Sequence, residues 1–381
     1  MTTTQKTPDT RGLAGQTIGE TKVCSVNQTQ LIYRGFEIAD LAANATFEEV
    51  SYLLLKGSKP SASELAAFTE RLVSERPVSD EILDVVASVA TAPDVHPMDI
   101  LRTGISLLAH HDPDCEDNSP EAEERKSIRL LAKIPTIIGA SQAARDGRAR
   151  VAPDSTLSHA GNVLWLMTGE KPSEIASKVM DVSLVLYAEH DFNASTFTCR
   201  VIASTNSDMH SAVCGGVGAL KGNLHGGANE AAMDMLKDIM DDTEGGAITV
   251  DAWMQRAFEE KRKLMGFGHR VYKNGDHRAG ILREWGLKFA ADVDPTMKKW
   301  FDLGDEVQAI MLRDKNIHPN VDFPCGMTYF SMGIPVPQYT PIFVASRITG
   351  WCAHIMEQHQ NNRIIRPLAE YSGPALSNWN D

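Results

Sequence analysis

Three short stretches, far apart in the chain, each carry a side chain of a catalytic type beside glycine or proline. His225 lies in the run LHGGANE (224–230), His269 in GFGHRVY (266–272) and Asp322 in NVDFP (320–324). An enzyme that removes a proton next to a carbonyl needs a base and needs donors that stabilise the resulting enolate. One carboxylate and two imidazoles can supply both, so these three residues are the candidate catalytic groups.

His225 precedes two glycines and a helix that we expect to begin near Ala228. Glycine lets the backbone approach a ligand closely, and the partial positive charge at a helix N-terminus disfavours an imidazolium. A histidine in such a position tends to stay neutral and to donate a hydrogen bond to a carbonyl. The sequence leaves open a structural alternative, in which the ring bonds only to the backbone of its own turn.

His269 follows two glycines and is itself followed by Arg270 and Lys273. This pattern fits a loop that brings an imidazole and cations to an anionic ligand, and it also fits a solvated surface turn. Asp322 stands between apolar neighbours, which desolvate a carboxylate, raise its pKa and make it a better base near neutral pH. Alternatively, Asp322 only organises its turn through backbone hydrogen bonds.

Three arginines stand in sequence contexts that suit a bound carboxylate. Arg278 follows a Gly-Asp-His run, Arg347 lies inside a predicted helix, and Arg366 follows two isoleucines. The guanidinium fork matches a carboxylate bidentately. A structural salt bridge is the alternative for each of them.

The composition is that of an ordinary soluble globular protein. Of the 381 residues, 43% are hydrophobic and 23% are charged, and a chain of this length usually forms two domains. The 37 Lys+Arg and 50 Asp+Glu give a net charge of −13, which argues against nucleic-acid binding. No apolar run approaches a membrane span, and the polar segment Met1–Asp9 lacks a signal-peptide pattern. We therefore expect a cytoplasmic protein.

Several suggestive patterns do not amount to a site. The six cysteines form no Cys-x-x-Cys pair, which favours reduced thiols over a disulfide framework. The glycine-rich run 214–218 lacks the dinucleotide fingerprint. His354 and His359 are five residues apart, so they do not share a helical face. The run from His110 to Cys115 contains possible metal ligands, but nothing in the sequence fixes their geometry. We expect neither a metal nor a nucleotide cofactor.

Most segments have the apolar periodicity of helices. Five predicted helices have recognisable start signals, at His96-Pro97, Pro172-Ser173, Gly227-Ala228, Thr249 and Thr340-Pro341. In the last of these Thr340 is the expected N-cap, and the helix runs to about Gln360. Strand signals are confined to Leu31–Tyr33 and part of Thr196–Ile202. Strands and helices do not alternate, which argues against a doubly wound sheet. The polar stretch from His111 to Arg125 is expected to be an exposed loop.

From Tyr33-Arg34-Gly35 to Ile365-Arg366-Pro367, the chain resembles the citrate synthase family. The densest matches are the run YAEHDFNAST (187–196) and the three stretches described first, in that order. The resemblance implies an almost all-α homodimer with no metal and no tightly bound cofactor. It also implies a large domain, residues 1–219 plus 334–381, with the oxaloacetate site and the dimer interface. A smaller mobile domain, residues 220–333, would carry the acyl-CoA site and the catalytic His and Asp.

The resemblance also implies a role for each site residue. Asp322 takes a proton from the methyl group of acetyl-CoA, His225 donates a hydrogen bond to the thioester oxygen, and His269 polarises the ketone of oxaloacetate and supplies a proton. Hydrolysis of the citryl thioester then releases citrate and coenzyme A. The residues implied to hold the oxaloacetate carboxylates are His190, Arg278, Arg347 and, from the other subunit, Arg366. Those implied to contact coenzyme A are Arg270, Lys273 and Lys315.

Three departures from the family pattern bear on geometry and substrate choice. His277 stands where proline usually precedes Arg278, and Asn223 stands where proline is common before the first histidine motif. Phe323-Pro324-Cys325-Gly326 replaces the more usual Phe-Tyr-Ser-Gly. That last segment lines the acyl pocket in the family, so a 2-methylcitrate synthase, which uses propionyl-CoA, remains an alternative. The short N-terminal part favours a simple dimer over a hexamer.

Two more remote readings belong to other functional classes. A helical binding protein that keeps the fold without activity predicts the loss of one of the three candidate catalytic residues, whereas all three are present. A metal-dependent hydrolase built on the histidines predicts that chelators abolish its activity.

Overall fold

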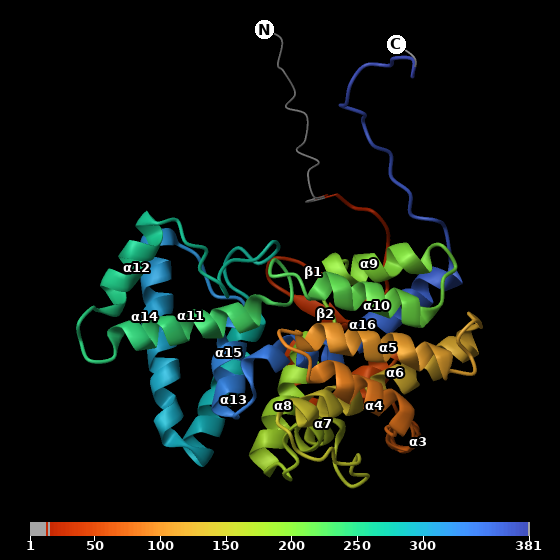
Figure 1. Ribbon diagram of the computed structural model, residues 1–381, viewed down its shortest axis with the longest axis horizontal. Helices are drawn as coiled ribbons and strands as arrows, with labels where there is room; N and C mark the ends of the chain where they lie inside the picture. Colours follow the sequence, from red (N-terminus) through yellow and green to blue (C-terminus); the bar gives the residue numbers. More distant parts are fainter. Residues whose placement is uncertain (1–12, 14–15, 380–381) are drawn as a thin grey trace.

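Helices dominate the described chain. The computed structural model describes residue 13 and residues 16–379, and the N-terminal segment Met1–Asp9 discussed above lies outside the described residues. In the described part, sixteen α-helices and one small sheet confirm the all-α expectation (Figure 1). No helix among these residues is both long enough and apolar enough to cross a membrane.

The elements follow one another along the chain with short connections. The first ten helices are α1 (Ile38–Asn44), α2 (Phe47–Lys56), α3 (Ala62–Ser74), α4 (Asp80–Ala90), α5 (Pro97–His110), α6 (Pro120–Arg145), α7 (His159–Thr168), α8 (Glu174–Tyr187), α9 (Ala194–Ala203) and α10 (Met209–Leu220). The remaining helices are α11 (Ala228–Thr243), α12 (Val250–Glu259), α13 (His277–Val293), α14 (Lys298–Lys315), α15 (Asp322–Ser331) and α16 (Tyr339–Gln360), with 3₁₀ turns η2 (Pro295–Met297) and η3 (Val336–Gln338). Strands β1 (Cys24–Val26), β2 (Leu31–Tyr33) and β3 (Phe36–Glu37) form an antiparallel sheet in that order, with Tyr33 opposite both Cys24 and Phe36.

The helices form two groups that meet where α13 contacts α8 and α1 and where α11 contacts α16. Helices α11 to α15 pack on one another, and α12, α14 and α11 lie at one end of the molecule (Figure 1). Helices α4 to α7, α9 and α10 lie on the other side with α16 among them. Helix α13 contacts both α15 and α8, so it joins the two groups.

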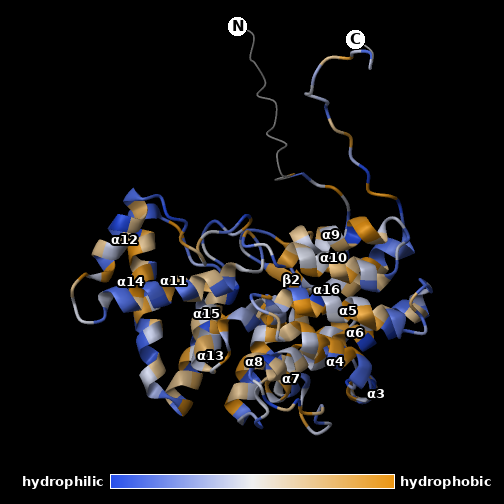
Figure 2. Ribbon diagram, viewed as in Figure 1, coloured by the Kyte–Doolittle hydropathy of each residue, from blue (hydrophilic) through white to orange (hydrophobic). Residues whose placement is uncertain are grey.

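Burial distinguishes the central helix from the outer ones. Nearly all of α16 from Tyr339 to Met356 is buried. Helix α12, at the edge, buries only Val250, Trp253, Met254 and Ala257, the spacing of one helical face. Figure 2 shows the same contrast, because the outer helices α12 and α14 carry hydrophobic and hydrophilic residues side by side.

Four of the predicted helix starts are confirmed. His96 caps α5 with its side chain, which accepts a hydrogen bond from the Met98 amide. Ser173 caps α8 and Thr249 caps α12 in the same way. Helix α11 begins at Ala228, directly after Gly227. A short polar side chain satisfies an amide that the first helical turn leaves without a partner.

The predicted N-cap at Thr340 is wrong. Helix α16 begins one residue earlier, at Tyr339, and continues from the 3₁₀ turn η3 with Gln338 as its N-cap. The Thr340 amide and hydroxyl both donate to the Glu230 carboxylate of α11 instead. A partner distant in sequence therefore replaces the local cap.

Two other local predictions are also corrected. The strand candidate Thr196–Ile202 is part of α9, because the Asn193 side chain accepts hydrogen bonds from the amides of Ser195 and Thr196 and starts a helix there. The stretch from His111 to Arg125 is not entirely a loop, since Ser119 caps α6 and Pro120 opens it. The loop ends at residue 119.

Candidate active site

His225 lies in the tight turn between α10 and α11. The Gly226 amide donates to the Leu220 carbonyl at 2.9 Å, and a Cβ on Gly226 would lie 2.6 Å from that same oxygen. The turn therefore requires glycine at this position. It places the His225 ring three residues before α11 begins.

Hydrogen bonds to one ring nitrogen fix the orientation of His225. Its Nε2 lies 2.8 Å from Ser195 Oγ, 3.2 Å from Asn193 Oδ1 and 3.3 Å from the Ser195 amide nitrogen. A backbone amide can only donate, so we assign Nε2 as the acceptor from Ser195 and place the ring proton on Nδ1. Asn193 Oδ1 can only accept, so with this tautomer it is a neighbour of Nε2 and not a hydrogen-bond partner. Burial lowers the pKa of His225 to about 3, and the positive charge of Arg347 adds to that effect. The ring is a neutral donor near neutral pH.

The loop of the second candidate imidazole is tied to the segment that carries the candidate base. The Gly268 amide donates to the His318 carbonyl at 2.8 Å. Asn320 donates twice, from its amide to the Gly266 carbonyl and from its side chain to the Gly268 carbonyl, both at 2.9 Å. These bonds hold the His269 loop against the start of α15.

The close approach of these two segments depends on glycine at position 266. Gly266 has a φ of +82°, and a Cβ there would lie 2.8 Å from the Cβ of Phe323. Any other residue would be strained by its backbone conformation and would also collide with Phe323.

His269 is held as a neutral ring whose proton lies on the side away from its own loop. Its Nδ1 accepts hydrogen bonds from the amides of Val271 at 3.1 Å and Tyr272 at 3.3 Å, which leaves the proton on Nε2. The ring stacks on Tyr272 with centroids 4.6 Å apart and meets the His190 ring edge-on at 5.0 Å. Burial lowers the pKa of His269 to about 4, and the charge of Arg278 contributes.

Asp322 is the first residue of α15 and has the properties of a base. The Tyr187 hydroxyl donates to its Oδ1 at 2.8 Å, and the Asp322 amide donates to Asn320 Oδ1 at 3.0 Å. Burial raises the pKa of Asp322 to about 6, against the opposing effects of the Tyr187 hydrogen bond and of Arg278 and Arg347. The carboxylate is ionised near neutral pH and more basic than a solvated aspartate.

Phe343 and Tyr187 lie between the candidate residues and show how they converge. The Phe343 ring is 4.4 Å from the Tyr187 ring and 6.3 Å from the His225 ring, centroid to centroid. The Arg347 guanidinium lies 4.8 Å from the Phe343 centroid. Tyr187 in turn contacts Asp322, so one aromatic pair links the first histidine, the carboxylate and an arginine.

The two predicted interior arginines differ in what their guanidinium groups contact. Arg347 is 1% exposed and donates from Nε to the Tyr187 carbonyl at 2.7 Å, while its buried Nη1 has no hydrogen-bond partner in the described chain. Arg278 uses Nε and Nη2 on the two oxygens of Asp276, at 3.0 and 2.8 Å. This is the salt bridge that the sequence left open. Its Nη1 lies 3.3 Å from the Leu186 carbonyl.

His190 is buried beside the His269 loop, and its Nε2 lies 3.1 Å from the Tyr272 hydroxyl. Burial, with the charge of Arg278, holds the pKa of His190 well below its usual value. The ring is therefore neutral, like the other two. It meets the rings of His269 and Tyr272 edge-on, with centroids 5.0 and 5.5 Å away.

Four predicted residues are exposed on the surface. Arg366 lies on the tail that leaves the body after α16 (Figure 1) and reaches none of the residues above. Arg270 is exposed next to His269, and Lys273 donates to the His269 carbonyl at 3.1 Å. Lys315, at the end of α14, lies 4.2 Å from the Phe258 ring centroid.

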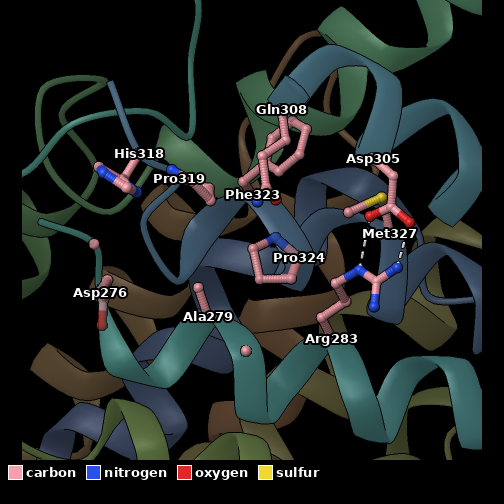
Figure 3. A pocket seen from close by; sticks show the side chains of 12 residues that line it. Asp276, Ala279, Arg283, Asp305, Gln308, His318, Pro319, Phe323, Pro324 and Met327 are labelled. Atoms are coloured by element: carbon pink, nitrogen blue, oxygen red, sulfur yellow. Dashed lines mark hydrogen bonds and ion pairs between the residues drawn. The ribbon is translucent and has the colours of Figure 1, made fainter. Parts of the chain in front are cut away.

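A cavity of about 220 Å³ lies beside α15 but does not contain the three candidate catalytic residues. It lies between α13, α14 and the segment that precedes Asp322, with the Arg283–Asp305 ion pair at one edge (Figure 3). Phe323 and Pro324 line it, and it shares Asp276, His318 and Phe323 with the contacts described above. We therefore place the candidate site at the convergent histidines and carboxylate.

Sequence reasoning missed three residues that the geometry makes important: Tyr187, Ser195 and Tyr272. Tyr187 and Ser195 lie within the run YAEHDFNAST, and Tyr272 closes the run GFGHRVY. Their positions within these two runs were therefore the available signal, but the runs did not indicate which contacts the side chains make. Their partners lie 30 to 135 residues away, and periodicity cannot reveal such contacts.

Comparison with known proteins agrees with this geometry. The sequence profile described as "Citrate synthase, C-terminal domain" matches residues 12–368. The chain is 43% identical to a 2-methylcitrate synthase of Shewanella oneidensis over 365 residues, 95% of this chain and 94% of that protein. It is also 43% identical to a citrate synthase of Mycolicibacterium smegmatis over 366 residues, 95% of each chain.

Solved structures show the same fold. The citrate synthase of Pyrobaculum aerophilum superposes with a TM-score of 0.87 at 35% identity, over 97% of this chain and 93% of that one. The citrate synthase of Thermoplasma acidophilum, in a ternary complex with carboxymethyl coenzyme A and oxaloacetate, superposes with a TM-score of 0.89 at 28% identity over 97% of both chains. The chain belongs to the citrate synthase family and is an enzyme of the citrate synthase type.

Proposed function

We propose that this enzyme condenses acetyl-CoA with oxaloacetate and water to give citrate and coenzyme A. One observation carries the proposal: a carboxylate with a raised pKa and two neutral imidazoles lie near a buried arginine, Arg347, whose Nη1 has no hydrogen-bond partner in the described chain. The family contains enzymes of this activity, and one of them has been solved in complex with carboxymethyl coenzyme A and oxaloacetate.

Asp322 is the proposed base. Abstraction of a proton from the methyl group of a thioester requires a carboxylate that is ionised yet more basic than one in water. Its pKa of about 6 meets both requirements at pH 7 to 8. The Tyr187 hydroxyl holds Oδ1 in place at 2.8 Å, so the other oxygen is the one we assign to proton removal.

His225 is the proposed donor to the thioester oxygen. As the methyl proton leaves, negative charge develops on that oxygen, and a preorganised donor stabilises it. The proton assigned to Nδ1 serves this role because Nε2 accepts from Ser195. Because the donor is neutral, it can share its Nδ1 proton with the oxygen as the charge develops, which favours an enol-like intermediate.

His269 is the proposed donor to the ketone of oxaloacetate. Its Nε2 proton faces away from the loop amides that bind Nδ1. A hydrogen bond to the ketone oxygen makes the ketone carbon more electrophilic, and the enolate carbon attacks it. The new alkoxide takes the Nε2 proton of His269, and His269 recovers a proton from solvent. Water then attacks the thioester carbonyl carbon, the C–S bond breaks and coenzyme A leaves as its thiol. The proton that Asp322 removed is released to solvent, which restores the carboxylate.

The proposed oxaloacetate ligands are His190, Arg278 and Arg347. The free Nη1 of Arg347 supports this assignment most directly, because an unpaired buried guanidinium nitrogen is costly unless a ligand accepts from it. Arg278 keeps Asp276 as its partner, so we assign only its Nη1 side to the substrate. The His190 ring, whose Nε2 lies beside the Tyr272 hydroxyl, is assigned as a hydrogen-bonding ligand of the substrate.

We propose two domains, residues 1–219 plus 334–381 and residues 220–333. This division puts the three candidate catalytic residues in the smaller part and His190 and Arg347 in the larger part. Movement between the parts would close the site over substrate and exclude water. Arg270, Lys273 and Lys315 are the proposed coenzyme A contacts; all three are exposed cations on the smaller part.

We also propose that the enzyme is a homodimer in which Arg366 completes the site of the other subunit. The tail beyond α16 leaves the body of its own subunit (Figure 1), and its Leu368, Tyr371 and Leu376 are 87%, 78% and 103% exposed. Apolar side chains exposed in this way are expected to pack on another surface. A second subunit would cover them and receive Arg366.

A 2-methylcitrate synthase is the second candidate, because similar relatives carry that name as well. One additional methylene in an apolar pocket changes selectivity by only about 1–3 kcal/mol. The test is kcat/KM for acetyl-CoA and for propionyl-CoA, measured as free thiol release with oxaloacetate. The proposal expects the higher value with acetyl-CoA. A higher value with propionyl-CoA would assign the alternative, and no thiol release with either would refute both.

A further inference from the structure

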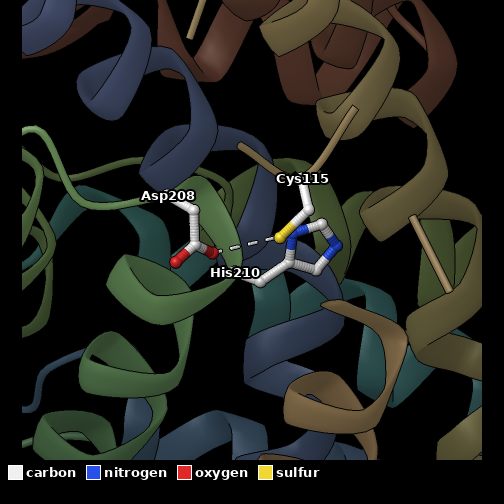
Figure 4. A group of neighbouring side chains, drawn as sticks. All are labelled: Cys115, Asp208 and His210. Atoms are coloured by element: carbon white, nitrogen blue, oxygen red, sulfur yellow. Dashed lines mark ion pairs between the residues drawn. The ribbon is translucent and has the colours of Figure 1, made fainter. Parts of the chain in front are cut away.

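A second group of side chains with ligand chemistry lies in the large helical group. Cys115, Asp208 and His210 each offer one atom, and these atoms all lie within 4.8 Å of one another (Figure 4). Cys115 lies on the loop between α5 and α6. Asp208 is the N-cap of α10, and His210 is the second residue of that helix. The loop and the helix start are about 90 residues apart in the chain and meet only through the fold.

The His210 ring has a free nitrogen that faces this group. His210 is 2% exposed, and its Nδ1 has no hydrogen-bond partner in the described chain. That nitrogen lies 4.0 Å from Asp208 Oδ1, on the side of the Cys115 sulfur (Figure 4). A buried ring nitrogen without a partner is unusual in a folded protein. It is the observation that distinguishes this group from an ordinary surface cluster.

The other ring nitrogen has the environment typical of a metal-binding histidine. His210 Nε2 lies 3.4 Å from Asp112 Oδ2. Histidines that bind metals usually point their second ring N–H at a carboxylate, which fixes the tautomer. With the proton on Nε2, the lone pair of Nδ1 points toward Cys115 and Asp208.

The loop that carries Cys115 is already held in place. Buried Lys126 donates from Nζ to the Cys115 carbonyl at 3.2 Å and to the Asp117 carbonyl at 2.7 Å. Arg129 binds Asp112 through Nε at 2.9 Å and also pairs with Asp114. Both nearby cations therefore have partners of their own, and Asp208 retains its negative charge for a ligand.

We propose that Cys115, Asp208 and His210 bind a Zn²⁺ ion, with water as the fourth ligand. Zn²⁺ accepts thiolate, imidazole and carboxylate together in a tetrahedral arrangement. Binding displaces the thiol proton of Cys115 to solvent and forms the Zn–S bond. Zn–S and Zn–N bonds of about 2.3 and 2.1 Å require the ligand atoms to approach one another by roughly 1 Å. Asp208 and His210 both lie at the start of α10 with their ligand atoms 4.0 Å apart, so rotation of these side chains and of the Cys115 side chain supplies the approach.

The ion would stabilise the fold and take no part in the proposed reaction. Ten residues of α10, about 15 Å of helix, separate His210 from Leu220, which supports the turn of His225. The site links the α5–α6 loop to the far end of that helix. The sequence run from His110 to Cys115 contributes Cys115 as a ligand and Asp112 as its support, whereas neither His110 nor His111 belongs to the group.

The test is a metal titration of the full-length enzyme after treatment with a chelator. Co²⁺ serves as the spectroscopic probe, since a thiolate–Co²⁺ bond gives a charge-transfer band in the near ultraviolet. We expect one equivalent to bind with that band, and Zn²⁺ to displace it. Cys115→Ser is expected to lose the band and to bind Zn²⁺ at least about tenfold more weakly. Cys214→Ser, which removes the other half-buried thiol, is the matched control and is expected to keep both.

Three outcomes would overturn the proposal: no saturable binding of one equivalent by the unaltered enzyme, a band that persists in Cys115→Ser, or a band lost in Cys214→Ser. Thermal unfolding with and without Zn²⁺ gives a second readout. Zn²⁺ is expected to raise the Tm of the unaltered enzyme and of Cys214→Ser, and to leave that of Cys115→Ser unchanged. Neither readout depends on catalytic activity, so the result is independent of the proposed reaction.

Discussion

Replacement of Tyr187 by phenylalanine is expected to make Asp322 a stronger base that is ionised only at higher pH. The Tyr187 hydroxyl donates to Asp322 Oδ1 at 2.8 Å and so stabilises the charged form of the carboxylate. Burial already raises the pKa of Asp322 to about 6. Loss of the donor removes an opposing effect, and the pKa should rise further.

The magnitude follows from the strength of one hydrogen bond to a charged group. Such a bond contributes about 1.5–3 kcal/mol, and one pKa unit corresponds to about 1.4 kcal/mol. The pKa of Asp322 should therefore rise by about 1–2 units. The phenylalanine ring keeps its edge contact with Phe343, for which the centroids are 4.4 Å apart, and Arg347 still binds the carbonyl of residue 187. The substitution therefore removes little besides the hydroxyl.

The assay is the pH profile of kcat/KM for the acyl-CoA, measured by thiol release at saturating oxaloacetate. In the unaltered enzyme the rate is expected to fall as pH falls through about 6, because the base becomes protonated. In Tyr187→Phe this acidic limb should lie about 1–2 pH units higher. Tyr339→Phe is the matched control, since the buried Tyr339 hydroxyl donates to the Gly326 carbonyl and not to Asp322. An unshifted limb in Tyr187→Phe, or an equal shift in the control, would refute the reasoning.

The remaining predictions concern three other residues. Asp322→Asn should abolish turnover while oxaloacetate still binds, and a retained kcat would remove Asp322 from the base role. The pKa of Asp322 is raised from 3.8 in the unfolded chain to about 6 in the fold, so the unaltered enzyme loses stability as pH rises through that window. Asn at this position does not ionise. The free energy of unfolding of Asp322→Asn, relative to that of the unaltered enzyme, should therefore rise by up to about 3 kcal/mol between pH 4 and pH 7, measured by urea unfolding. His225→Ala should slow exchange of the acyl-CoA methyl protons with solvent, followed by NMR; normal exchange would contradict the donor role. Arg366→Ala should weaken oxaloacetate binding by calorimetry without dissociating the dimer, and an unchanged Kd would show that the contact across the subunits is misassigned.

The sequence indicated the candidate residues best where a local constraint is visible in the residue types. Gly226 and Gly266 are required by close approaches to Leu220 and Phe323, and glycine beside histidine is easily recognised. The start of α11 after Gly227 and the capping of α5 by His96 are similarly local. Such features depend on residues within one turn of each other, so a pattern can reveal them.

Features that depend on distant partners were missed or misread. Thr340 has every property of an N-cap but bonds to Glu230, 110 residues away. The β-branched run from Thr196 to Ile202 suggests a strand, yet the Asn193 cap and burial in the large helical group make it helical. Tyr187 looks like an ordinary core aromatic until its hydroxyl is seen against Asp322, 135 residues later.

The end of α8 explains why so many of the candidate residues meet at one place. The last turn of a helix leaves its carbonyls without partners inside the helix and carries partial negative charge. In α8 the Leu186 carbonyl accepts from Arg278 Nη1, and the Tyr187 carbonyl accepts from Arg347 Nε.

Two guanidinium groups are thus held by the unsatisfied carbonyls of a single helix end. Each reaches that end from another helix, α13 for Arg278 and α16 for Arg347. The same residue that accepts from Arg347 through its backbone donates to Asp322 through its side chain. The helix end binds Arg278 through Nη1 and Arg347 through Nε. Within the described residues, this leaves the Nη1 of Arg347 without a hydrogen-bond partner. A dicarboxylate substrate would complete the hydrogen bonding that the helix end begins.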